Sequence, residues 1–284
     1  MCRARAVVVS LFLLFLAGCS STTFIYNRLD FILPWYLDDY VELNRQQDVF
    51  LDEQLAPFLA WHRSEELPTY ISILDDIDST LDRDITADDV AAISLEFEEA
   101  WFRLEGRALD WLLAHGAELS DEQVDEFLAE LWEQQEKYEK KYLERSDEEN
   151  SEDSYDSLVD SMQDYLGRLD REQKQVLENA SAGLQRSDGI WLRERAAWLE
   201  RLEGFMQRQP GWQAAIRDAV ARRSEVVSEE YLALYDHNLG VIYEALAQVL
   251  NSRSKTQDRR LRGKLSDLRK DLETLVSQGK AKAA

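Results

Sequence analysis

Residues 119–142, LSDEQVDEFLAELWEQQEKYEKKY, show how most of this chain is built. Ser120 stands three positions before Gln123, so each side chain can hydrogen-bond the free backbone N–H of the other at a helix start. The apolar residues that follow recur at steps of three, four or seven, as on one face of an α-helix. They are Val124, Phe127, Leu128, Leu131, Tyr138 and Tyr142. We therefore expect a helix over about 120–143.

Three more helix starts have the same form: Leu43-Asn44-Arg45-Gln46-Gln47, Ile85-Thr86-Ala87-Asp88-Asp89 and Leu169-Asp170-Arg171-Glu172-Gln173. The apolar spacing predicts further helices near 86–115, 170–208, 212–250 and 256–277, with Pro210-Gly211 as a break. The 11 Gly and 4 Pro of this 284-residue chain are too few for the turns of a sheet protein. The expected fold class is all-α, an elongated bundle of long antiparallel helices.

The N-terminus predicts a lipoprotein signal peptide. An apolar run from Ala6 to Ala17 is too short to span a membrane, which takes about 20 residues. It ends in Leu16-Ala17-Gly18-Cys19, which resembles the lipobox of bacterial lipoproteins, although an ordinary signal peptide with a chance cysteine is the alternative. We expect cleavage before Cys19 and a membrane anchor of acyl chains on that residue. Ser20, in place of Asp, implies the outer membrane, with the protein on its periplasmic face.

The expected processing divides the chain into a signal peptide (1–18), a lipidated tether (19–23), a helical domain (24–250) and a basic C-terminal helix and tail (251–284). Cys2 leaves with the signal peptide and Cys19 takes the lipid. The mature chain then has no thiol for a disulfide, a nucleophile or a zinc site.

Charge is distributed unevenly along the chain. The whole chain carries a net charge of −23. The segment from Arg253 to Lys282 carries +6, and Arg3 and Arg5 are removed with the signal peptide, so residues 19–252 carry −31. So acidic a body repels nucleic acid and anionic headgroups. We favour packing of the basic helix against this body over binding of an external anionic surface. Its leucines form one stripe at steps of four and three: Leu261, Leu265, Leu268, Leu272 and Leu275.

The most acidic stretch is 144–157, where seven acids stand beside one Arg. We expect a solvated linker or a frayed hairpin there. A calcium site is the alternative, but the EF-hand pattern with its central Gly is missing.

Aromatic residues crowd the segment next to the expected lipid. They are Phe24, Tyr26, Phe31, Trp35, Tyr36 and Tyr40. Trp and Tyr are favoured at membrane interfaces. However, amphipathic first helices usually pack inward, and the nearby acids are unfavourable beside anionic lipid. We favour the core over the interface, and keep Trp35, Tyr36 and Tyr40 as candidate interaction or membrane-proximal residues.

Trp61 and His62 complete the candidate interaction residues. His62 and Glu66 would share a helix face, but the Glu-x-x-His pattern of di-iron bundles and the His-Glu-x-x-His zinc motif are absent. We favour a hydrogen-bonded structural histidine beside Trp61. Since the Gly-x-Ser-x-Gly elbow and the phosphate and dinucleotide loops are also absent, we expect no catalytic residue, metal or cofactor. An enzyme remains open only if a pocket gathers His62 with distant acids.

A family resemblance covers the stretch from Tyr26 to Tyr70. It is carried by Tyr26-Asn27, Trp35, Leu37-Asp38-Asp39-Tyr40, Gln47 and Trp61-His62-Arg63-Ser64-Glu65-Glu66-Leu67-Pro68-Thr69-Tyr70. With the lipobox, these residues resemble a family of proteobacterial lipoproteins catalogued as a domain of unknown function, number 6279. The resemblance implies an envelope location and a helical fold, and it brings no activity. Leu43-Asn44…Gln47 and Leu119-Ser120…Gln123 are also similar to the Leu-Thr-x-x-Gln motifs of periplasmic chaperones.

Two functions therefore remain. The first is a non-catalytic interaction or envelope-assembly factor, anchored in the membrane through Cys19 and presenting its helices to a protein partner in the envelope. The alternative is a holdase-like periplasmic chaperone for exported polypeptides. A closed bundle with one localised patch would favour the first, and a large exposed apolar concavity the second.

Overall fold

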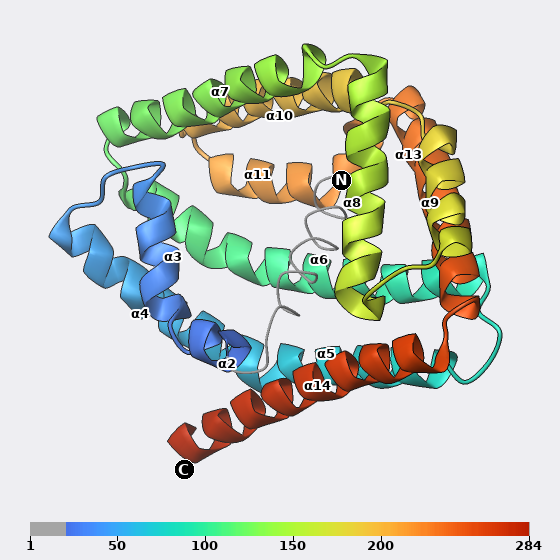
Figure 1. Ribbon diagram of the computed structural model, residues 1–284. Coiled ribbons are helices and arrows are strands. Elements are labelled where there is room, and N and C mark those ends of the chain that lie inside the picture. Colours follow the sequence, from blue (N-terminus) through green and yellow to red (C-terminus); the bar gives the residue numbers. More distant parts are fainter. Residues whose placement is uncertain (1–20, 284) are drawn as a thin grey trace.

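The structure, a computed structural model, describes residues 21–283, and this part of the chain contains helices and no strand (Figure 1). The prediction of an all-α fold is confirmed. The elements are α2 (Ser21–Tyr26), α3 (Leu29–Asp38), α4 (Arg45–Trp61), the π-helix η1 (His62–Glu66), α5 (Leu67–Thr80), α6 (Ala87–Glu118), α7 (Asp121–Leu143), α8 (Asp147–Leu166), α9 (Arg171–Gly183), α10 (Asp188–Met206), α11 (Trp212–Ala221), α12 (Arg223–Val226), α13 (Glu229–Asn251) and α14 (Lys255–Ala283).

All four predicted helix starts are closed by a capping box. The backbone N–H of Gln123 donates to Ser120 Oγ at 3.2 Å, and the N–H of Ser120 donates to Gln123 Oε1 at 2.9 Å. The same two-way bonding occurs at Asn44/Gln47, Thr86/Asp89 and Asp170/Gln173. Each box satisfies N–H groups that the first helical turn leaves free, which is why the sequence could place these starts.

The capping glutamines also join helix starts that are far apart in sequence. Gln47 Nε2 donates to Gln123 Oε1 at 2.8 Å, and Gln123 Nε2 donates back at 2.9 Å. Gln173 and Gln257, both buried, form the same reciprocal pair at 3.1 and 2.8 Å. The first pair fixes α4 to α7 and the second fixes α9 to α14, since a buried amide without a partner is costly.

We expect Gln173→Leu to lower the free energy of unfolding by about 1–3 kcal/mol, because the buried amide of Gln257 loses one of its partners. Gln175→Leu, on the exposed side of the same helix, is the matched control and should stay within about 0.5 kcal/mol of the parent. Urea unfolding followed by circular dichroism measures both. Equal effects of the two variants would contradict a stabilising amide pair.

Two of the long helices expected from the sequence are interrupted, and there the prediction was wrong. The range 170–208 divides into α9 and α10, because the side chain of Asn238 bonds both the N–H and the C=O of Gln185, at 2.8 Å each. The range 212–250 divides into α11, α12 and α13, because the Ser228 hydroxyl caps a new helix at the N–H of Tyr231.

The acidic stretch 144–157 is helical from Asp147 onward, so the linker prediction was also wrong. Ser146 and Glu149 form a fifth capping box at the start of α8. The acids of the first turn are stabilised there, because the N-terminus of a helix carries partial positive charge. Arg145 binds Asp153, and Arg186 binds Asp147 at 2.7 Å, which offsets the remaining repulsion.

Neighbouring helices run antiparallel, as predicted. Figure 1 shows α7 beside α10 and α5 beside α14, with α6 extending from the α4 side to the α13 side, and α9 packs against both α8 and α13. Side-chain bonds give the register of these pairs. Tyr243 of α13 bonds Ser94 of α6 at 2.8 Å, for example, while Asn251 bonds Ile85 before the start of α6.

The C-terminal helix packs into the main core, as we favoured. The five leucines of its stripe are at most 6% exposed and share one apolar cluster with residues of α5, α8, α9 and α13. Its basic residues face the acids of α5: Arg262 binds Asp78 at 2.9 Å, and Arg269 binds Asp75 at 2.7 Å. These ion pairs join the basic helix to the acidic body.

Candidate functional site at the first helices

Cys19, the predicted lipidation residue, lies outside the described residues, and α2 begins two positions after it, at Ser21. Any group attached to Cys19 is therefore tied closely to α2 and α3. These two helices and the residues that hold them are the candidate functional site.

Helix α2 is fixed to the body by a polar and aromatic contact set that we call the α2 clamp. It consists of Tyr26, Asn27, His62, Arg63 and Gln278. Tyr26 is 3% exposed, and its hydroxyl lies 2.8 Å from His62 Nδ1. The Arg63 guanidinium lies 4.9 Å from the centre of the Tyr26 ring and donates to Asn27 Oδ1 at 2.9 Å. Asn27 in turn donates to Gln278 of α14 at 3.0 Å.

The clamp is presented by a π-helical turn between α4 and α5. In η1 the N–H of Leu67 bonds the carbonyl of His62, five residues back. Pro68, in the first turn of α5, has no N–H, and its ring crowds a carbonyl one turn earlier, which weakens a regular α-helix at this point. The wider turn accommodates the proline, and π-turns are frequent at functional sites.

His62 is neutral at pH 7 and is bonded at both ring nitrogens. Its Nδ1 faces the Tyr26 hydroxyl and its Nε2 lies 3.2 Å from the Tyr70 hydroxyl, so one nitrogen donates and the other accepts. Burial, with a smaller contribution from the charge of Arg63, lowers the pKa of His62 to about 4. Burial also raises the pKa of Tyr26 to about 12. The prediction of a hydrogen-bonded histidine beside Trp61 is confirmed.

Glu66 does not join His62 in a shared site. It is 4% exposed and bonds Arg103 of α6, whose Nε lies 3.0 Å from Glu66 Oε1. The π-turn alters the spacing that would place His62 and Glu66 on one α-helical face. Within the described residues, no three His, Cys, Asp or Glu side chains gather in a metal-binding cluster.

The opposite side of α2 and α3 carries exposed aromatic residues. Phe24 of α2, Arg28 of the turn between the two helices, and Phe31 and Trp35 of α3 are exposed, and we call these four residues the aromatic stripe. The three aromatic side chains are 64%, 71% and 63% exposed, and the Arg28 guanidinium lies 5.6 Å from the centre of the Phe24 ring. Our preference for a core position was wrong for these residues, because Leu33 and Leu37 form the inward face of α3 instead.

The five candidate residues from the sequence fall into two groups. Trp35 and Tyr36 are exposed on α3, and Tyr40 follows that helix with its ring centre 6.4 Å from that of Phe127. Trp61 and His62 lie at the junction of α4 and η1, where they are largely covered. Sequence reasoning missed Arg28, which stands in the turn between α2 and α3.

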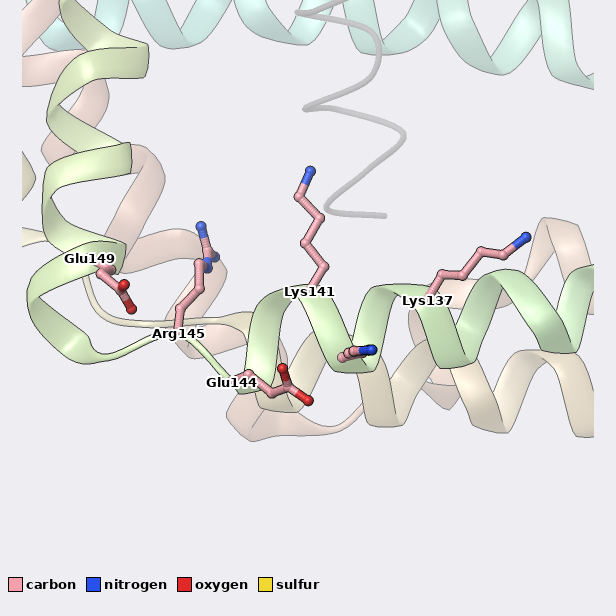
Figure 2. A pocket seen from close by; sticks show the side chains of 6 residues that line it. Lys137, Lys141, Glu144, Arg145 and Glu149 are labelled. Atoms are coloured by element: carbon pink, nitrogen blue, oxygen red, sulfur yellow. The ribbon is translucent and has the colours of Figure 1, made fainter.

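A basic depression lies elsewhere, at the end of α7. Figure 2 shows Lys137 and Lys141 on that helix and Arg145 in the connection that follows it, with Glu144 and Glu149 nearby. Cations are stabilised at a helix C-terminus by its partial negative charge. Lys137 also binds Glu133 at 2.7 Å, and Arg145 binds Asp188 at 3.0 Å. These contacts account for the cluster, and His62 does not line it.

The described helices include none with the length and apolar character needed to cross a membrane. Residues 39–232 match a family whose description is "Family of unknown function (DUF6279)". The chain belongs to this family. The DUF6279 match begins just after α3 and ends early in α13, so the aromatic stripe and α14 lie outside it. No curated protein and no solved structure matches the chain.

Proposed function

We propose that this DUF6279 protein is a lipoprotein, anchored by acyl chains on Cys19 to the periplasmic face of the outer membrane, whose helical domain is a non-catalytic interaction or envelope-assembly factor. The observation that carries the proposal is the lipobox Leu16-Ala17-Gly18-Cys19, placed two residues before a helix that is fixed to the core. A lipid on Cys19 would hold the folded domain directly at the membrane.

The chemistry of the α2 clamp supports a non-catalytic role. A general acid or base works best with a pKa near the operating pH. The pKa of His62 lies well below this range and that of Tyr26 well above it. Both groups are engaged in holding α2.

The anchor is tested by Cys19→Ala. We expect this variant to remain as an unprocessed precursor, to take up no labelled fatty acid, and to lose the membrane attachment that the acyl chains provide. Cys2→Ala is the matched control, because Cys2 leaves with the signal peptide, and it should be labelled normally. Normal fatty-acid labelling of Cys19→Ala would contradict the proposal, whereas labelled protein in the inner membrane would contradict only the outer-membrane location.

One observation favours the alternative function, a holdase-like chaperone: aromatic side chains are exposed on an acidic body. Such a surface could bind unfolded chains. The Cys19→Ala protein, produced without its signal peptide, allows a direct test. As an interaction factor it should not slow the aggregation of a reduced, unfolded client followed by light scattering. The chaperone would be favoured if equimolar protein suppressed the aggregation of the client and the double variant Phe31→Ser/Trp35→Ser did not.

A further inference from the structure

The aromatic stripe is an apolar surface at the point where the chain leaves the structure toward Cys19. Phe24, Phe31 and Trp35 are each more than 60% exposed, and Ile25 and Tyr36 of the same two helices are 46% and 53% exposed. Contiguous exposed apolar surface on a folded domain marks a site of contact with a protein or a membrane. Trp and Tyr in such a surface suit an interface that is apolar on one side and wet on the other.

The length of chain before α2 determines what this surface can reach. Only Ser20 separates Cys19 from Ser21, so the Cα atoms of Cys19 and Ser21 are at most about 7 Å apart. Acyl chains on Cys19 are buried in the membrane, and the start of α2 then lies at the level of the headgroups.

The α2 clamp prevents the stripe from turning freely. Tyr26 is buried in the main core cluster, and Asn27 is bonded to both Arg63 and Gln278. Since the clamp holds the inward side of α2, and Leu33 holds the inward side of α3, the stripe faces away from the body. A domain held this close to the membrane presents that side to it.

The stripe carries charge of both signs: Arg28 is basic, and the exposed Asp38 shares the face of Phe31 and Trp35 at the end of α3. Arg28 lies within the stripe, where its guanidinium can meet lipid phosphate while the aromatic rings enter the interface. Asp30 is one residue before Phe31, and therefore about 100° around α3 from it and off the stripe. The remaining body, with its large negative charge, is repelled by anionic headgroups and stays in the aqueous phase.

We propose that the aromatic stripe lies in the headgroup region of the leaflet that carries the Cys19 lipid and seats the domain on the membrane in one orientation. This inference rests on the proposed lipid anchor and names the surface of the protein that the membrane occupies. The occupant is lipid, and a second copy of this chain is an outcome that the test must separate from it.

The expected absence of other thiols makes the test specific. With Cys2 removed and Cys19 acylated, a single introduced cysteine is the one thiol that a fluorophore can label. We would label Phe31→Cys and Trp35→Cys on the stripe with a polarity-sensitive dye. Asp30→Cys, adjacent on the same helix, and Lys141→Cys, on α7, are the matched controls. The proteins are placed in vesicles of phosphatidylethanolamine and phosphatidylglycerol, with and without nitroxide-labelled lipid.

We expect blue-shifted emission and at least twofold quenching by the nitroxide lipid at positions 31 and 35, and little of either at 30 and 141. Bound protein without quenching at 31 and 35, or with equal quenching at 30, would overturn the inference and leave the anchor intact. A blue shift at 31 that rises with protein concentration in detergent, without quenching in vesicles, would assign the stripe to a second copy and also overturn it.

The mass of the N-terminal peptide tests the anchor separately. If it carries no acyl chain, the proposed function fails. The stripe is then tested in Cys19→Ala protein held by an N-terminal hexahistidine tag on vesicles with nickel-chelating lipid. Quenching confined to positions 31 and 35 would still support the stripe as a membrane contact, and its absence would overturn it.

Discussion

Deletion of residues 252–284 should abolish cooperative thermal unfolding of this protein. The deletion removes α14, whose five buried leucines belong to the largest apolar cluster together with Leu67, Leu74 and Leu177. Burying one leucine side chain contributes about 1.5–3 kcal/mol, so five contribute roughly 7–15 kcal/mol. This is as large as the whole free energy of unfolding of a typical domain, about 5–15 kcal/mol.

Single substitutions give the same prediction in graded form. Leu275→Ala, at a position with no exposed surface, should cost about 2–5 kcal/mol, because it removes buried methyl groups and leaves a cavity. Ser266→Ala, on the exposed side of α14, is the matched control and should cost less than about 0.5 kcal/mol. Thermal and urea unfolding followed at 222 nm measure these effects. An unchanged melting temperature of the truncated protein would mean that α14 serves an external partner.

The sequence predicted those parts of the fold that depend on local hydrogen bonds. The capping boxes at Asn44, Thr86, Ser120 and Asp170 formed as expected, because each needs only residues within one helical turn. The leucine stripe of α14 was likewise visible as a period along one helix.

The missed features depend on residues that are distant in sequence. The break between α9 and α10 is held by Asn238, which lies 53 positions from Gln185. The acidic stretch 144–157 was assigned to a linker on composition, although Ser146 and Glu149 have the spacing of a capping box. Arg186, which neutralises Asp147, is 39 positions away. The local charge alone therefore predicted a linker where the chain forms the helix α8.

The candidate site was predicted in part for the same reason. A helical period shows which residues of α2 and α3 share a face, but not which face turns inward. Tyr26 turned inward toward His62 and Arg63. Leu33 turned inward onto an apolar cluster of α4 and α6, and Trp35 did not. The bonded state of His62 was expected, whereas the π-turn that presents it was not.

Acid should weaken the fold well above the pH at which carboxylates titrate, and His62 is a principal reason. Above pH 6.5 its imidazole is neutral in both the folded and the unfolded chain, and stability is complete. As the pH falls from 6.5 to about 4, the unfolded chain binds the proton while the folded chain does not. The free energy of unfolding therefore falls, by about 3 kcal/mol in total from this residue. Burial lowers the pKa of His115 as well, so that residue adds a loss in the same direction.

The contribution of His62 can be isolated by comparing His62→Gln with the parent between pH 7 and pH 4.5. The glutamine cannot take up the proton, so the variant should be less stable at pH 7 but should lose less stability on acidification, with the difference reaching about 2–3 kcal/mol at pH 4.5. His237→Gln, the same exchange at an exposed position on α13, is the matched control. Parallel pH profiles of His62→Gln and the parent would contradict a neutral, buried His62.

The same acidification should also loosen the α2 clamp, because protonated His62 can no longer accept a hydrogen bond from a tyrosine hydroxyl. Hydrogen exchange measures this effect, and we expect the amides of residues 21–38 to exchange earlier than those of α14.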